Sequence, residues 1–271
     1  MDPRPRPRTA VLGAGEVPWD SPVAPADDAG LRGDGCFETL LVHGGDPART
    51  VRLEEHLDRF ARGAGQVGIP FDRAGWVALV RSLTGDVPAG TEAALRLSLS
   101  RSELGVATLR PVPATVRAGR DGVHVVTLAR GTSTVPDAPW LLTAAKTSSY
   151  AVNSAALREA RRRGAEDALF LDAAGEVLEA PTANLLWRAQ GRWWTPPQAG
   201  RAVLPGTTLA AVTARFGVQE RACRPGDLLR AEGAWLLSSL RGAAPVRSLD
   251  GTPLPVAATL TGALQRTALG L

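Results

Sequence analysis

The sequence predicts an α/β protein of two domains that are divided near residue 119. The chain has 271 residues, which suits one large or two small domains. Segments with strand-like and helix-like apolar patterns follow one another along it. Proline and glycine become frequent over residues 111–121, just before a new apolar strand begins. We therefore expect a disordered lead-in over residues 1–8, a small domain over 9–119 and a larger domain over 120–271.

The first domain contains a mixture of strand and helix patterns. Residues 1–8 alternate proline with arginine, and chain ends of this kind are often poorly ordered. Leu53, His56, Leu57 and Phe60 recur at helical spacing, with Gly65 near the end of that segment. The expected elements are, in order, an edge strand with loops over 9–30, a strand over 32–43, a second short strand, a helix over 53–64, a helix over 73–83 and a strand over 93–100.

The second domain has shorter apolar runs that are separated by turn residues. Asp172-Ala-Ala-Gly175 has the polar, glycine-ended composition of a hairpin turn. The expected elements are, in order, a strand over 123–128, a helix over 153–163 that stops at Gly164, a strand over 168–171, short strands over 177–178, 184–188 and 192–195, a helix from 205 to about 216 and a buried strand over 234–239.

The charge of the chain argues against nucleic-acid binding. Its 31 basic and 27 acidic residues give a formal net charge of only +4. Nucleic-acid binders gather positive charge together with interleaved aromatic residues. The basic cluster here, Arg161–Arg163, lies at a predicted helix end, where cations complement the helix dipole.

The sequence also predicts neither a metal site nor a membrane span. Two cysteines, Cys36 and Cys223, and three histidines are scattered without metal-ligand spacing. The N-terminal segment has no apolar signal core, and no stretch is long enough to cross a bilayer. We therefore expect a cytoplasmic protein.

Lys146 is the strongest single candidate for chemistry. It is the only lysine of the chain, and every other basic side chain apart from histidine is arginine. It lies between an apolar run and a helix-like segment, flanked by small residues. Burial there would lower its pKa and supply the neutral amine that Schiff-base chemistry requires. Arginine cannot take this role, because it does not lose its proton. The alternative is an ordinary solvent-exposed lysine at a helix start.

Several other side chains have both a structural and a functional interpretation. Thr207 and Thr208 at a predicted helix start form either an anion site or an ordinary N-cap. Glu179 is either an exposed loop residue or a carboxylate that faces a protonated ring nitrogen. Arg59 either pairs with Glu55 on the solvated helix face or turns inward to clamp a phosphate. Ser238 and Ser239, at a strand end, would add hydroxyl donors to the same anion.

Taken together, these motifs resemble those of the fold-type IV pyridoxal-phosphate enzymes, which include branched-chain aminotransferases, D-amino-acid aminotransferases and aminodeoxychorismate lyases. The resemblance covers about residues 30–248 and rests on five motifs in the expected order: Gly33-Asp-Gly-Cys-Phe-Glu-Thr39, Leu53-Glu-Glu-His-Leu-Asp-Arg59, Ala145-Lys-Thr-Ser-Ser-Tyr-Ala-Val-Asn153, Leu178-Glu-Ala-Pro-Thr-Ala-Asn184 and Leu204-Pro-Gly-Thr-Thr208.

The resemblance implies a role for each matching residue. Lys146 would bind pyridoxal 5'-phosphate as a Schiff base and shuttle protons, and Glu179 would keep the pyridine nitrogen protonated. Tyr150 would lie near the cofactor. The phosphate would be held by Arg59, Thr207, Thr208 and Ser239.

The resemblance favours aminodeoxychorismate lyase, which expels pyruvate and leaves p-aminobenzoate for folate biosynthesis. The opening Gly-Asp-Gly-Cys-Phe motif is similar to the lyase version. Arg101 matches an arginine near the substrate carboxylates in lyases and D-amino-acid aminotransferases, although Ser102 replaces the glycine that commonly follows it. Phe37 stands where D-amino-acid aminotransferases have a tyrosine. The alternatives are a D-amino-acid or branched-chain aminotransferase and, as a minor one, a non-catalytic protein that binds the cofactor.

The family resemblance also implies an architecture. We expect two α/β domains with the cofactor in the cleft between them, a small-molecule substrate, and a homodimer in which loops of the partner shape the substrate pocket.

Overall fold

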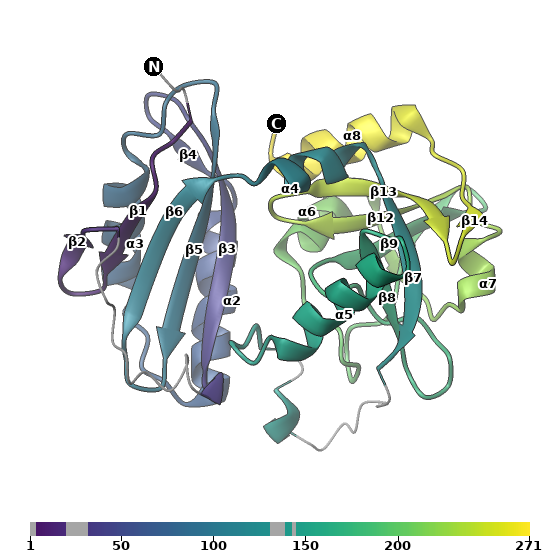
Figure 1. Cartoon of the computed structure of the whole chain (residues 1–271), viewed down its shortest axis with the longest axis horizontal. Coiled ribbons are helices and arrows are strands. Elements are labelled where there is room, and N and C mark those ends of the chain that lie inside the picture. Colours follow the sequence, from purple (N-terminus) through teal and green to yellow (C-terminus); the bar gives the residue numbers. More distant parts are fainter. Residues whose placement is uncertain (1–3, 20–31, 131–138, 143–144) are drawn as a thin grey trace. The chain divides into compact units, whose positions relative to one another are not determined.

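The chain forms a mixed α/β structure with two sheets, which confirms the predicted fold class (Figure 1). The computed structural model describes residues 4–19, 32–130, 139–142 and 145–271. One compact unit consists of Met1–Pro113 and Ala145–Tyr150, and the other of Ala114–Ala144 and Ala151–Leu271. The first unit thus ends six residues before the expected boundary at 119 and takes in the segment around Lys146, which we had assigned to the second domain.

In the described residues, six strands build the sheet of the first unit. They lie in the spatial order β2 (Gly15–Val17), β1 (Arg8–Val11), β6 (Gly105–Pro111), β5 (Glu92–Ser100), β3 (Gly35–His43) and β4 (Arg49–Thr50). All neighbours in this sheet are antiparallel. Leu95, Leu97 and Leu99 of β5 are buried and alternate with Arg96 and Ser98, so the two sets of side chains point to opposite faces.

Two helices cover the leucine face of this sheet (Figure 1). Helix α2 (Leu53–Val67) buries His56, Leu57 and Phe60, as the helical spacing predicts. It extends three residues beyond the expected end, because Gly68 takes the left-handed conformation that terminates helices. Helix α3 (Arg73–Thr84) begins where the carboxylate of Asp72 accepts a hydrogen bond from the backbone of Gly75 at 2.9 Å.

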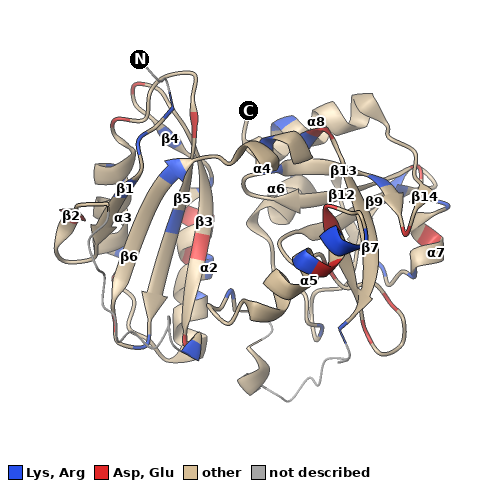
Figure 2. Cartoon of the chain, in the orientation of Figure 1, with Lys and Arg blue, Asp and Glu red and all other residues tan. Residues whose placement is uncertain are grey.

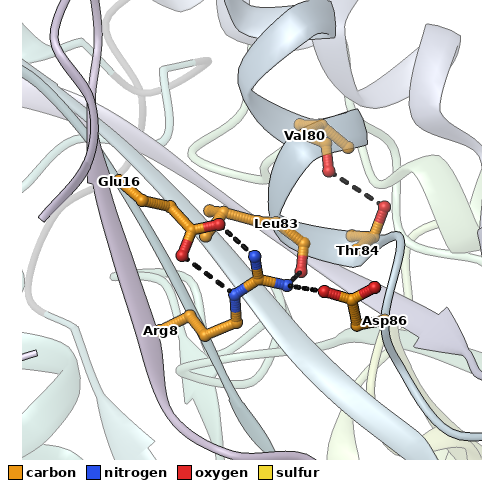
Figure 3. A network of polar contacts seen from close by, with 6 residues as sticks. All are labelled: Arg8, Glu16, Val80, Leu83, Thr84 and Asp86. Atoms are coloured by element: carbon orange, nitrogen blue, oxygen red, sulfur yellow. Dashed lines mark hydrogen bonds and ion pairs between the residues drawn. The ribbon is translucent and has the colours of Figure 1, made fainter.

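Arg8, which we expected in a disordered lead-in, begins β1 and is anchored on both sides (Figure 3). Its guanidinium pairs with Glu16 of β2, donates to the backbone carbonyl of Leu83 at 2.9 Å and lies 3.4 Å from Asp86. A cation at the last turn of α3 also complements the helix dipole. These bonds explain why the strand begins at Arg8. Residues 1–3 of the expected lead-in lie outside the described residues.

A second sheet forms the framework of the other unit. Its strands lie in the order β11 (Gln219–Glu220), β10 (Arg192–Thr195), β9 (Asn184–Ala189), β12 (Gly233–Ser238), β13 (Gly242–Leu249), β7 (Val123–Ala129) and β8 (Asp167–Leu171), and β14 (Thr252–Pro253) pairs with β13. The pairs β10–β11, β13–β7 and β7–β8 are parallel, whereas the remaining pairs are antiparallel.

Helices α6 and α8 pack on one face of this second sheet, and a separate core fills the other. Leu186, Trp235 and Leu237 meet helices α6 and α8, whereas their strand neighbours Leu185 and Leu236 belong to the core on the opposite face. The helices of this unit are α4 (Ala114–Ala118), α5 (Ala151–Arg162), α6 (Thr207–Phe216), α7 (Pro225–Leu228) and α8 (Ala258–Leu269), with short 3-10 turns at Gly119–Asp121 and Pro139–Leu141.

Charged residues of both signs are interspersed along the elements of each unit (Figure 2). This distribution agrees with the small net charge of the chain. Within the described ranges, we find no helix that combines the length and the apolar character needed to cross a bilayer.

Candidate active site

The backbone around Lys146 pairs with the start of β3. The amide of Phe37 donates to the carbonyl of Lys146 at 2.9 Å, and the amide of Ser148 donates to Gly35 at 2.8 Å. An antiparallel bridge between Cys36 and Thr147 lies between these two bonds. Lys146 is therefore held beside β3 by an isolated bridge and the two backbone hydrogen bonds around it, so its position depends on the first sheet.

Gly33 packs closely against Ser149, in the segment that follows Lys146. The Ser149 hydroxyl donates to the carbonyl of Gly33 at 3.1 Å. A Cβ atom on Gly33 would lie 2.6 Å from that hydroxyl, and φ at Gly33 is +72°, which side chains rarely adopt. Only glycine fits at this position, which is the first residue of the glycine-rich motif.

The amine of Lys146 lies against two aromatic rings. Its Nζ is 4.5 Å from the centre of the Phe37 ring and 5.6 Å from that of Tyr150. The two rings meet edge to face, with centres 5.3 Å apart and an interplanar angle of 83°. The structure thus brings together three of the predicted site residues, and it places the Lys146 amine beside two aromatic rings.

Arg96, which the sequence analysis did not single out, belongs to the same cluster. Its guanidinium carbon lies 3.9 Å from the centre of the Phe37 ring, on the sheet face opposite α2. Arg96 is partly exposed, and the partial desolvation of its guanidinium lowers its pKa, while the nearby Tyr150 hydroxyl opposes this effect and Arg110 adds to it. Arginine remains protonated in spite of such shifts. This face therefore offers a fixed positive charge at the Phe37 ring, which the lysine amine also contacts.

Arg59 has turned inward, as the functional interpretation required, and it binds a buried carboxylate. Its Nε and Nη2 donate to the two oxygens of Glu38, each at 2.7 Å. His56 Nδ1 lies 2.7 Å from the same carboxylate. All three side chains are buried between β3 and α2. The alternative pair with the exposed Glu55 is therefore wrong for this structure.

The charges in this buried cluster are closely balanced. Burial alone would raise the pKa of Glu38, but the Arg59 charge and the hydrogen bonds from His56 and Arg59 outweigh it and lower the pKa to about 2. Burial lowers the pKa of His56 in spite of the adjacent carboxylate. Glu38 is thus ionised, and its bidentate bond fixes the plane of the Arg59 guanidinium.

Arg101, expected near the substrate carboxylates, is held by a different partner. Its Nε and Nη2 lie 3.0 and 3.3 Å from the two carboxylate oxygens of Asp34, and its Nη1 donates to the carbonyl of Gly68 at 3.1 Å. Both side chains of this pair are about two-fifths exposed. The structure places Arg96 against the Phe37 ring, which the Lys146 amine also contacts, and it pairs Arg101 with Asp34.

Glu179, in the second unit, has fixed hydrogen-bond donors. Its Oε2 accepts from the backbone amide of Leu204 at 3.0 Å and from Nδ2 of Asn184 at 3.2 Å. Its Oε1 lies 4.0 Å from the guanidinium of Arg130. Only 14% of the Glu179 side chain is exposed, so the exposed-loop interpretation is wrong. These neighbours fix the position of the carboxylate.

Thr207 and Thr208 lie buried at the start of α6, and Ser239 follows directly after β12. The residue that precedes the helix is Gly206, and no side chain caps the helix at this position. The ordinary N-cap interpretation of the threonines is therefore not supported, because the capping position belongs to a glycine. An uncapped helix N-terminus with two buried hydroxyl groups is suited to an anion.

The predicted residues thus fall into two groups, one in each unit. Phe37, Lys146 and Tyr150 are in contact, and Arg59 lies on the other face of the same strand. In the second unit, Glu179 and the start of α6 are linked through Asn184 and Leu204. No cluster of three or more potential metal ligands occurs in the part of the chain that the structure describes.

The chain resembles known proteins over almost its whole length. The family model described as amino-transferase class IV matches residues 35–249. A bifunctional aminodeoxychorismate lyase / D-amino acid transaminase of Mycobacterium tuberculosis is 41% identical over an aligned length of 259 residues, and the match covers 86% of this chain and 88% of that protein.

Solved structures extend this similarity to the fold. A hypothetical aminotransferase from Mycobacterium tuberculosis in its PLP-bound form has a TM-score of 0.90 at 36% identity, covering 98% of this chain and 99% of that one. A fold IV transaminase from Curtobacterium pusillum has a TM-score of 0.89 at 34% identity, covering 97% of each chain. The branched-chain aminotransferase of Escherichia coli has a TM-score of 0.81 at 22% identity, covers 97% and 94%, and shares the fold alone.

Proposed function

Because the chain belongs to the class IV aminotransferase family, we propose that it is a pyridoxal-phosphate enzyme that cleaves aminodeoxychorismate to p-aminobenzoate and pyruvate. The observation that carries this proposal is the extensive identity to a relative named for this lyase activity. The site geometry supports the cofactor, and the identity supports the reaction.

The described residues fit pyridoxal phosphate. Lys146 would hold its aldehyde, since the amine lies against two rings at a backbone position fixed by β3. Glu179 would face the pyridine nitrogen, because two hydrogen-bond donors hold its carboxylate in a fixed position. The phosphate would be held by Thr207 and Thr208 at the uncapped start of α6, by Ser239 and by Arg59. Tyr150 would lie near the ring.

Each residue has a defined task during the reaction. The bound cofactor supplies an electron sink that stabilises negative charge on the substrate carbon. The Lys146 amine removes a proton from the substrate carbon that carries nitrogen, and it returns a proton later. Glu179 keeps a proton on the ring nitrogen. Phe37 and Tyr150 keep water away from two sides of the amine.

We assign Arg96 the task of binding a substrate carboxylate. Its guanidinium lies on the Phe37 ring, and the amine of Lys146 lies on the same ring. A carboxylate that pairs with this arginine would be held beside the amine. Arg101 is the weaker candidate, because the contact with the Phe37 ring is made by Arg96. Phe37 shapes this substrate side and offers no hydroxyl.

D-amino-acid transamination is the second candidate function. It is favoured by the same relative, whose name includes both activities. Branched-chain transamination has weaker support, since the solved structures of those enzymes are only 21–22% identical. A non-catalytic role is disfavoured because the amine, the carboxylate and the arginine of the family motifs are all present. A homodimer and a cytoplasmic location stay predictions.

The lyase proposal is tested with enzymatically generated aminodeoxychorismate. Formation of p-aminobenzoate and pyruvate by the wild-type holoprotein, and by neither the Lys146→Ala protein nor the cofactor alone, is the expected result. A protein that binds the cofactor and forms no p-aminobenzoate would contradict the lyase assignment. In that case, a keto acid from a panel of D-amino acids with 2-oxoglutarate would establish the second candidate.

A further inference from the structure

Asn184, the first residue of β9, joins two parts of the second unit. Its Nδ2 donates to Oε2 of Glu179 at 3.2 Å and to the carbonyl of Leu204 at 2.8 Å. The amide of Leu204 donates to the same Glu179 oxygen at 3.0 Å. The three residues therefore form a closed set of hydrogen bonds around one carboxylate oxygen. The Asn184 side chain is almost fully buried, so solvent offers little replacement for these bonds.

The other end of the Asn184 amide faces the start of helix α6. A Cβ atom added to Gly206 would lie 1.8 Å from Asn184 Oδ1, far inside van der Waals contact. The backbone of Gly206 has φ −80° and ψ 129°, a conformation open to any residue. Glycine is therefore required here for space and not for its backbone freedom. The amide oxygen cannot move aside unless the bonds at Nδ2 break.

We propose that Asn184 is a positioning residue that couples the Glu179 carboxylate to the N-terminus of α6. One planar amide contacts both groups, so it sets the spacing between them. This inference rests on the proposed function only in assigning the two groups to the pyridine nitrogen and the phosphate of one rigid cofactor. A site whose two ends are already correctly spaced binds such a ligand without reorganisation.

The chain provides matched controls for this role. Gln219, an exposed amide side chain of the short strand β11, lies outside the motifs of the candidate site. Gly226 lies in the first turn of helix α7, where an added Cβ would make an ordinary 3.5 Å contact with Arg230. Gln219→Ala and Gly226→Ala thus repeat the two chemical changes, loss of an amide and gain of a Cβ atom, at positions outside the candidate site.

The experiment is a double-mutant cycle read by cofactor affinity. Apoproteins of the wild type, Asn184→Ala, Gly206→Ala, the double variant and both controls are titrated with pyridoxal phosphate and with pyridoxal, which lacks the phosphate. Thermal melting of each apoprotein verifies that it is folded. The readout is a dissociation constant, and it requires no turnover.

We expect Asn184→Ala and Gly206→Ala each to weaken pyridoxal phosphate binding by about tenfold or more, the size expected for a lost hydrogen bond to a charged group. In the Asn184→Ala background the clash is gone, so Gly206→Ala should change the dissociation constant by less than about twofold. Asn184→Ala should also weaken pyridoxal, through Glu179, and reduce the preference for the phosphate form. A general loss of structure would not make the effect of Gly206→Ala on the dissociation constant depend on Asn184. The dissociation constants of the control variants should stay near that of the wild type.

Three results would overturn the inference. The first is a folded Asn184→Ala protein with wild-type affinity. The second is an equal loss from Gly206→Ala in both backgrounds, which would mean that the two residues act independently. The third is a wild-type apoprotein that binds no pyridoxal phosphate, which would also overturn the cofactor assignment.

If Asn184→Ala does not fold, Asn184→Asp keeps the size but removes the donor, and wild-type affinity in that protein would overturn the inference equally. Failure of the lyase assay alone would contradict only the proposed reaction.

Discussion

The carbonyl of Lys146 accepts a hydrogen bond from the backbone amide of Phe37 at 2.9 Å, and the amine of Lys146 lies 4.5 Å from the centre of the Phe37 ring. The same two residues are thus joined through both main chain and side chain. Because Phe37 belongs to β3, the first sheet determines where the Lys146 amine lies.

We predict that Gly33→Ala reduces the fraction of protein that carries covalently bound cofactor. The new Cβ would lie 2.6 Å from the Ser149 hydroxyl, and so it would displace the segment that holds Lys146. Absorbance of the bound cofactor per protein chain measures this fraction. Gly13→Ala is the control, since Gly13 has a similar positive φ but nothing within 4 Å of the added atom. If both variants lost the same fraction of bound cofactor, the close contact between position 33 and Ser149 would not be the cause of the loss.

We predict that Glu38→Ala destabilises the apoprotein by about 3–5 kcal/mol, because it leaves the buried Arg59 without its charge partner. Urea denaturation measures this loss. Glu55→Ala, a change of the same kind on the exposed face of α2, should leave the denaturation midpoint close to that of the wild type. If both variants lose the same stability, the buried pair has no special role.

The contribution of Glu38 should also depend on pH. Its pKa in the folded protein is about 2, below the ordinary 4.5, so the folded state favours the ionised form. The stabilisation is therefore complete above about pH 4.5 and is lost as the pH falls toward about 2. The difference in unfolding free energy between the wild type and Glu38→Gln should shrink across this window. A difference that stays constant with pH would contradict the ionised assignment.

We predict that Arg96→Gln raises KM for the carboxylate substrate by about tenfold or more, since it removes a charge-assisted hydrogen bond. The affinity for pyridoxal phosphate should change little. Arg81→Gln, on an exposed position of α3, is the control with the same loss of charge. An unchanged KM for Arg96→Gln, with a raised KM for Arg101→Gln, would return the task to the arginine that the sequence analysis favoured.

Glu179→Ala should reduce kcat by at least about a hundredfold, because the ring nitrogen would lose the carboxylate that keeps it protonated. Steady-state kinetics with saturating cofactor measure this. Glu220→Gln, an exposed acidic position of β11, should leave kcat unchanged. Near-normal turnover by the Glu179→Ala protein would show that the ring-nitrogen assignment is wrong.

Much of the fold could be predicted from periodicity, and the misses have physical causes. The helix over 53–64 and the strand over 192–195 follow from strongly patterned segments and agree with α2 and β10. Strand β13 was missed because it begins with small residues and carries Pro245, which is unusual inside a sheet. Helix α8 was missed because threonine and glycine weaken its helical signal.

The candidate site was harder to predict from the sequence, because it depends on strand register and on contacts between distant segments. The sequence offered Arg59 as an inward arginine, and the structure confirms that orientation. Its partner Glu38 comes from another element, although the buried strand pattern around it was a usable signal. Arg96 is recognised only when the register places it diagonally to Phe37. The tasks of the motif residues toward the cofactor stay predictions.

The most direct test of this account is reductive trapping of the cofactor. The chain has only two kinds of primary amine, the single lysine and the N-terminus, so the attachment site can be read without ambiguity. After incubation with pyridoxal phosphate and borohydride, mass spectrometry of tryptic peptides should find the added mass on residues 131–158, where the modified Lys146 also resists cleavage. The Lys146→Arg protein should carry none there. Attachment at the N-terminus alone, or an unmodified chain, would contradict the claim that Lys146 carries the chemistry.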